Sequence, residues 1–144
     1  MSVVDAKSSF SPKARAARQA LRDRLTATLS LDDLSGTDLI IEAVFENLEL
    51  KHRVTQETEP KLSANGIWAS NTSAIPIADL ATVSAHADRF IGLHYFSPVD
   101  KMPLLEVIVT PRTAADVTAT AVALGKKQGK TVIVVGDGPG FYTS

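Results

Sequence analysis

The fold of this chain is decided by the stretch R-F-I-G-L-H-Y-F-S-P, residues 89–98. Its centre, from Phe90 to His94, is apolar up to the histidine, with a charged residue before it and Ser97 and Pro98 after it. A short apolar run with such boundaries predicts a buried strand. His94 then stands where a strand ends, and ligands of open α/β sheets bind at the carboxyl ends of strands. His94 is therefore the first candidate for a titratable group in a functional site.

Segments of helical and of extended character alternate along the rest of the chain. We expect helices over residues 13–26, 48–59, 76–80 and 113–128, and strands over residues 39–44, 67–70, 90–94, 104–109 and 131–135. Ser11 and Asn47 are expected to cap helices, Pro60 to end or kink one, and Gly129 to stop one. The continuous apolar strand at residues 39–44 should be buried on both faces, as in parallel sheets. The fold class is therefore α/β, with a doubly wound, mostly parallel sheet.

The composition limits the classes of function. The chain has 144 residues, 44% of them hydrophobic and 22% charged, and a net charge of −1. This balance offers no basic field for nucleic acid, and we expect no transmembrane segment because no apolar run could span a bilayer. The sequence contains no cysteine, which excludes disulfides and thiolate metal sites, and we expect no metal. An N-terminus without a signal-peptide core indicates an intracellular soluble protein, cytoplasmic in a bacterium or in the mitochondrial matrix of a eukaryote.

Four motifs occur in order along the chain. They are D-L-I-I-E-A-V-F-E-N-L-E-L-K at residues 38–51, A-S-N-T-S-A at 69–74, G-L-H-Y-F-S-P-V-D-K-M at 92–102 and D-G-P-G-F-Y at 137–142. Together they resemble the NAD-binding domain of L-3-hydroxyacyl-CoA dehydrogenases, and most of all its multifunctional fatty-acid oxidation branch. The resemblance implies a Rossmann-like fold, NAD as cofactor, and oxidation of L-3-hydroxyacyl-CoA to 3-ketoacyl-CoA in fatty-acid β-oxidation. It also implies an acyl-CoA substrate and a thiolase subunit as a partner of the whole protein.

The chemistry of that reaction suits two of the residues. Oxidation of a hydroxyl requires a base for its proton, and histidine titrates at about 6.5, close to working pH. His94 would be that base. Glu106 lies in the apolar run at residues 104–109, where a carboxylate removed from water costs several kcal/mol unless it is paired. Bonded to the far ring nitrogen of His94, Glu106 would fix the tautomer and stabilise the imidazolium.

The resemblance assigns roles to five further residues. By family position, Ser73 and Asn71 would contact the substrate, and Glu46, Lys51 and Ser97 would face the cofactor. Ser97 stands where single-function relatives usually carry asparagine.

Each assignment has a plainer alternative. A strand-end histidine is commonly structural, and Glu106 alone would suit an exposed edge strand. Residues 71–73 could form a turn or cap the helix that follows. Residues 51–53 read as a solvated helix face. Glu42, an acid inside an apolar strand, is given no role.

The family also has parts that these motifs do not include. It opens with a strand and a G-x-G-x-x-G turn, which nothing before Asp38 contains, and G-D-G-P-G at residues 136–140 is rejected because Pro139 and Phe141 break the pattern. We therefore expect residues 1–12 to be a leader or an expression remnant. Residues 13–144 would be a partial NAD-binding domain, truncated at its first strand and glycine-rich turn and lacking the helical C-terminal domain. The alternative function is a non-catalytic Rossmann-like folding or association module, with exposed edges that form a homo-oligomer.

The first prediction concerns NAD. Because the glycine-rich turn supplies the backbone donors for the pyrophosphate, the 144-residue chain alone should bind NAD weakly or not at all and should be inactive. Isothermal titration measures this directly. Micromolar affinity for NAD would overturn the expectation.

Overall fold

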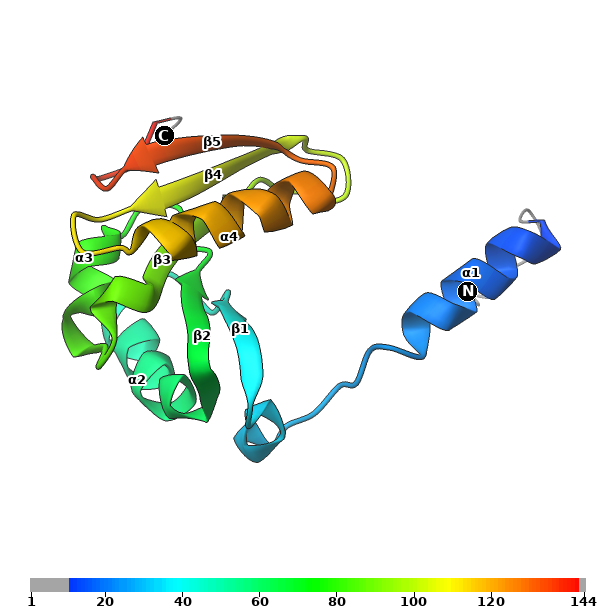
Figure 1. The fold of residues 1–144 in the computed structure, drawn as a ribbon, viewed down its shortest axis with the longest axis horizontal. Helices are drawn as coiled ribbons and strands as arrows, with labels where there is room; N and C mark the ends of the chain where they lie inside the picture. Colours follow the sequence, from blue (N-terminus) through cyan, green and yellow to red (C-terminus); the bar gives the residue numbers. More distant parts are fainter. Residues whose placement is uncertain (1–10, 143–144) are drawn as a thin grey trace, which may run out of the picture. The chain divides into compact units, whose positions relative to one another are not determined.

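The computed structural model describes residues 11–142 (Figure 1). The chain forms two compact units, Met1–Ser30 and Leu31–Ser144. In the first unit, α1 (Pro12–Arg22) begins after Ser11, whose hydroxyl accepts a hydrogen bond from the amide of Ala14 at 3.2 Å. This confirms the predicted cap, although the helix ends four residues earlier than expected. Residues 1–10 of the expected leader lie outside the described residues.

The second unit is built on one five-stranded sheet with the order β1-β2-β3-β4-β5. Its strands are β1 (Thr37–Glu42), β2 (Leu62–Ser70), β3 (Phe90–Tyr95), β4 (Leu104–Val109) and β5 (Thr131–Gly136). All neighbouring pairs are parallel except β3 and β4, which run antiparallel. Only a loop, residues 96–103, joins those two strands, so the chain reverses between them without a crossover helix. The predicted mostly parallel α/β sheet is confirmed.

Three predicted boundary residues, Asn47, Pro60 and Gly129, lie at helix ends in this unit. The helices are α2 (Leu48–Thr58), α3 (Ile77–Leu80) and α4 (Ala115–Lys127), with short 3₁₀ turns η1 (Leu31–Leu34), η2 (Glu59–Lys61), η3 (Ala81–Val83) and η4 (Ala87–Arg89). The side chain of Asn47 accepts from the amide of Leu50 at 2.8 Å, and Pro60 lies in the turn after α2. Gly129, with φ of 77°, follows α4. Within residues 11–142, no helix is both long and apolar enough to cross a bilayer.

Two hydrophobic clusters cover the two faces of the sheet. Because side chains alternate along a strand, Ile91 of β3 packs under α4 while Phe90 packs under α3 and the 3₁₀ turns. Trp68 belongs to the second cluster. Its ring stacks on Phe90 at 4.7 Å, and its indole N–H donates to the hydroxyl of Thr58 at 2.9 Å. Helices on both faces make the sheet doubly wound.

One expectation for β1 is wrong. The strand was expected to be buried on both faces, yet Ile41 is 39% exposed and Asp38 is also exposed. The reason is its position, because β1 lies at the edge of the sheet and pairs only with β2 among the described residues. Its neighbour in the sequence, Phe45, is exposed as well.

Gly92 allows α3 to approach the sheet closely. It lies in β3 between Ser70 of β2 and Ile108 of β4. A Cβ atom at this position would lie 2.8 Å from the Cβ of Ile108 and 2.8 Å from the Cδ1 of Ile77 in α3. Because the Ile108 contact is at a Cβ atom, the crowding cannot be relieved by turning the end of a side chain.

Gly92→Ala should therefore lower the free energy of unfolding by about 1–3 kcal/mol, the usual cost of overpacking a core. Gly136→Ala is the matched control, because Gly136 also lies in a strand but a Cβ there meets nothing within 4 Å. Urea unfolding of the two variants checks this prediction. Equal stability of both variants would contradict the close approach of α3.

Candidate active site

The candidate site lies where three parallel strands end. In the sheet register Glu42 of β1 lies beside Ser70 of β2, and Ser70 lies beside Gly92 of β3. Asn71 follows directly after β2, and His94 lies two residues beyond Gly92. The structure therefore brings the motif around Asn71 and the motif around His94 to one edge of the sheet, as expected for a ligand site in this class of fold.

His94 and Glu106 form the central pair of the site. They are directly opposed in the antiparallel register of β3 and β4, so their side chains project from the same face. The His94 Nδ1 lies 2.7 Å from the Glu106 Oε2, and the two residues are 7% and 0% exposed. Because a carboxylate only accepts, Nδ1 is the donor and Nε2 keeps its lone pair. The alternative of Glu106 as an exposed edge acid is wrong, because β4 is an interior strand.

Two aromatic rings pack against the imidazole. The ring of Phe96 lies 4.3 Å from that of His94, centroid to centroid, and the ring of Phe141 lies 5.8 Å away. Phe96 comes from the loop after β3, and Phe141 from the segment after β5. Apolar contact on these sides restricts the rotation of the ring, so the pair with Glu106 has one orientation.

Asn71 connects the end of β2 to the end of β3. Its Oδ1 accepts from the amide of Tyr95, the residue after His94, at 2.8 Å, and its own amide donates to the carbonyl of Glu42 at 2.8 Å. Ser73 is exposed, and its amide donates to Glu46 at 3.1 Å. Residues 71–73 do not provide the cap of α3.

Asp137 provides that cap instead. Its carboxylate accepts from the amides of Ile77 and Ala78 at 2.7 and 2.8 Å. This contact ties the segment at residues 136–140 to the start of α3. The glycine-rich stretch rejected as a dinucleotide fingerprint thus has a structural use.

Glu46 holds the loop that contains Asn71 and Ser73. Its Oε1 accepts from the hydroxyl of Thr72 and from the amides of Ser73 and Ala74, both at 3.1 Å. Partial burial raises the pKa of Glu46, but the Thr72 hydroxyl, the Lys51 charge and these amides together place it below the ordinary 4.5. Its side chain is still 37% exposed.

Lys51 is buried, which corrects its interpretation as part of a solvated helix face. Its Nζ lies 2.8 Å from the Oε1 of Glu42, 3.2 Å from the carbonyl of Val44 and 3.5 Å from the Oε2 of Glu46. Glu42, which the sequence reading left without a role, also accepts from the hydroxyl of Ser70 at 2.7 Å. An acid inside an apolar strand needs a partner. Lys51 in the following helix was the sequence signal from which the role of Glu42 could have been predicted.

Ser97 is the one predicted site residue that stands apart. It lies exposed in the loop after β3. Among residues 11–142 it forms no hydrogen bond with the other six candidates, whereas each of those six bonds to a neighbour in the site or to the loop that carries it.

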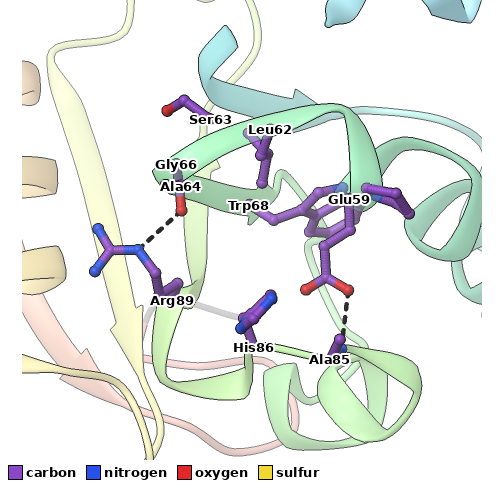
Figure 2. Close-up of a pocket in the computed structure, with 10 residues that line it drawn as sticks. Glu59, Leu62, Ser63, Ala64, Gly66, Trp68, Ala85, His86 and Arg89 are labelled. Carbon is purple, nitrogen blue, oxygen red and sulfur yellow. Dashed lines mark hydrogen bonds between the residues drawn. The ribbon is translucent and has the colours of Figure 1, made fainter. Parts of the chain in front are cut away.

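A cavity of about 270 Å³ lies elsewhere, under the first half of β2 (Figure 2). The carboxylate of Glu59 points into this region, but it already accepts from the hydroxyl of Ser84 and from the amide of Ala85. Arg89 donates its Nε–H to the carbonyl of Gly66 at 2.9 Å. These charged groups are occupied by the protein itself, so the candidate site is assigned to the strand ends and not to this cavity.

Known proteins resemble this chain in sequence. A family described as the 3-hydroxyacyl-CoA dehydrogenase NAD binding domain matches residues 3–138, a range that begins well before the first motif at Asp38. Fatty acid oxidation complex subunit alpha of Shewanella halifaxensis is 47% identical over 136 residues, covering 92% of this chain. The same subunit of Shewanella frigidimarina is 47% identical over 128 residues, covering 89% of this chain. The chain spans 19% and 18% of the length of these two relatives.

Solved structures have the same fold. The (S)-3-hydroxybutyryl-CoA dehydrogenase of Ralstonia eutropha is 38% identical, with a TM-score of 0.78 over 91% of this chain and 50% of that one. A diketoreductase is 28% identical, with a TM-score of 0.83 over 89% of this chain and 46% of that one. The sheet, the paired histidine and glutamate at its strand ends and the matched range together show that this chain belongs to the NAD-binding domain family of 3-hydroxyacyl-CoA dehydrogenases.

Proposed function

We propose that this chain supplies the catalytic base and the cofactor-facing strand ends for NAD-dependent oxidation of L-3-hydroxyacyl-CoA to 3-ketoacyl-CoA in fatty-acid β-oxidation. One observation supports this most directly: the 2.7 Å contact between the Nδ1 of His94 and the buried carboxylate of Glu106. This contact leaves the second ring nitrogen of His94 as a base.

The proton has a defined route. The hydroxyl of the substrate loses its proton to the Nε2 of His94 while C3 loses its hydrogen as hydride. The electrons of the former O–H bond make the second bond of the carbonyl group. The imidazole becomes a cation, and the carboxylate of Glu106 beside it stabilises that charge. Because both side chains are nearly buried, their interaction is screened little by water. Catalytic roles are thus proposed for His94 and Glu106.

The residues of the site fit one end of NAD. NAD, when bound, supplies the nicotinamide that accepts the hydride. The Glu46 side chain is partly exposed and Ser97 is exposed, so both could bond to hydroxyl or amide groups of that end. Lys51 is buried and would act through Glu46. Residues 11–142 include no glycine-rich turn for the pyrophosphate, which fits the weak NAD affinity expected of this chain alone.

Substrate contacts are proposed for Ser73 and Asn71. The exposed hydroxyl of Ser73 is available to bond the reacting oxygen. The side-chain oxygen of Asn71 is occupied by the amide of Tyr95, so only its NH₂ group remains available to a substrate. Both residues lie on the loop that Glu46 holds, next to the strand that carries His94.

Partners are proposed from the relatives and from the sheet edge. The relatives are subunits of a fatty acid oxidation complex, and a thiolase subunit is the proposed partner of a whole protein containing this chain. The exposed side chains of Ile41, Val44 and Phe45 at and after the edge strand β1 favour a second role, as a module through which copies of the chain associate. A cytoplasmic or mitochondrial location stays a prediction.

The assignment of His94 can be tested in a chimera. Residues 3–138, the range that the family matches, would replace the corresponding segment of the Shewanella halifaxensis subunit alpha, which is 47% identical to this chain over 136 residues. His94→Gln should keep the fold and the KM for acyl-CoA but lower kcat by roughly 10²–10⁴-fold, the usual effect of losing a general base. His86→Gln is the control, because His86 is exposed and lines the cavity under β2, not the candidate site. A normal kcat with reduced thermal stability would show that His94 is only structural.

Glu106→Gln should act through the same unit. Because the carboxylate works by orienting and stabilising the imidazole, the double variant with His94→Gln should be little slower than the slower single variant. Steady-state kcat values of the chimera and its three variants give the coupling. If the kcat of the double variant fell by the product of the two single-variant losses, the two residues would act independently.

A further inference from the structure

Glu42 stands at the centre of a buried polar network under the candidate site. Its Oε1 accepts from the Nζ of Lys51 at 2.8 Å and from the amide of Val44 at 2.6 Å, and its Oε2 accepts from the hydroxyl of Ser70 at 2.7 Å. Glu42, Lys51 and Ser70 are all buried. Burying the charges of Glu42 and Lys51 costs several kcal/mol of hydration, and apolar residues of similar volume would often give equal stability. We therefore look for a role of this pair other than stabilising the core.

Two branches of this network lead from Glu42 to the loop at residues 71–74. In the first, the Ser70 hydroxyl that donates to Glu42 accepts from the amide of Thr72 at 3.2 Å. In the second, Lys51 lies between Glu42 and Glu46, and Glu46 in turn accepts from the loop amides. In the first branch both hydrogen bonds run from the loop toward Glu42, and in the second the loop amides donate to Glu46 while Lys51 pairs with both carboxylates.

The loop is also tied to the strand that carries His94. The Asn71 side chain accepts from the amide of Tyr95 at 2.8 Å, and its own amide donates to the Glu42 carbonyl at 2.8 Å. Thr72, the middle of the loop, is buried, whereas Ser73 is exposed. The network thus fixes the backbone on either side of the serine hydroxyl and leaves that hydroxyl accessible.

We propose that Glu42 is a positioning residue for the reaction, which through Ser70 and through Lys51 and Glu46 holds residues 71–73 at a fixed place beside His94. The inference rests on the proposed function for the role of the loop, but the network can be tested without it. A misplacement of about 1 Å in such a loop costs up to roughly a hundredfold in rate.

Ser70→Ala is the first test, made on the 144-residue chain. It removes only the hydroxyl between Glu42 and the amide of Thr72. Measured by NMR hydrogen exchange, the amides of residues 72–74 should exchange about tenfold faster than in the unmodified chain after normalisation to the amides of β4. An equal acceleration of loop and β4 amides would overturn the proposal, because Glu42 would then stabilise only the whole fold.

Two further variants separate local from global effects. Glu46→Gln, at a partly exposed position, keeps the test available if Ser70→Ala fails to fold, and it should release the amides of Ser73 and Ala74 more than that of Thr72. Thr110→Val is the control, because it removes a buried hydroxyl that bonds to Thr113, away from the loop. In that control the normalised exchange of the loop should not change. Equal release of all three loop amides in Glu46→Gln would contradict the two-branch network.

Activity of the chimera supplies the second readout. Ser70→Ala should lower kcat by roughly ten- to a hundredfold and leave the KM for acyl-CoA within about twofold, since the loop is misplaced while the base remains. An unmodified chimera without activity would contradict the proposed function, and the exchange result would still decide the network. Faster loop exchange together with an unchanged kcat would overturn the positioning role alone.

Discussion

The rest of the site depends on one buried hydrogen bond across β3 and β4, between His94 and Glu106. A carboxylate at the position of Glu106 has lost its water, and such a group costs several kcal/mol unless a partner replaces that water. His94 is that partner, at 2.7 Å. The pair is also directional, because the carboxylate can only accept and so keeps the proton on Nδ1. The burial of Glu106 in the sheet thus leaves the other ring nitrogen of His94 available for its proposed role as a base.

The topology of the sheet makes this pair available. The antiparallel register places His94 directly opposite Glu106, with both side chains on the same face. The parallel strands β1 and β2 end beside β3, which brings the loop after Ser70 next to the base. The single antiparallel pair, β3 and β4, supplies His94 and Glu106, and the parallel pair, β1 and β2, supplies the loop at residues 71–74. The sheet therefore brings the proposed base and the proposed binding loop together.

Much of this arrangement could be predicted from the sequence, because its signals are local. Apolar runs, the capping residue Asn47 and the terminating residue Gly129 predicted most elements. Glu106, an acid inside the apolar run of β4, predicted a charged or polar partner, which is His94. The start of β2 at Leu62 could not be predicted, because residues 63–66, S-A-N-G, lack an apolar strand pattern and lie at an irregularity in the register with β1.

Long-range geometry explains the other differences. The burial of Lys51 depends on its contact with Glu42, and the exposure of β1 depends on which strand lies beside it. Neither is encoded in a short window of sequence. Glu46 shows the difference between sequence signals and folded contacts. Its family position suggested a ligand contact, whereas its hydrogen bonds to the loop after β2 appear only in the folded chain.

The tautomer of His94 is the quantity that tests this account most directly. In the 144-residue chain labelled with ¹⁵N, the two ring nitrogens of each histidine can be distinguished by NMR at alkaline pH. The account predicts that neutral His94 carries its proton on Nδ1, and that Glu106→Gln weakens this preference while the exposed His86 is unaffected. A proton on Nε2 of His94 would contradict it, because the nitrogen assigned as the base would have no lone pair to offer.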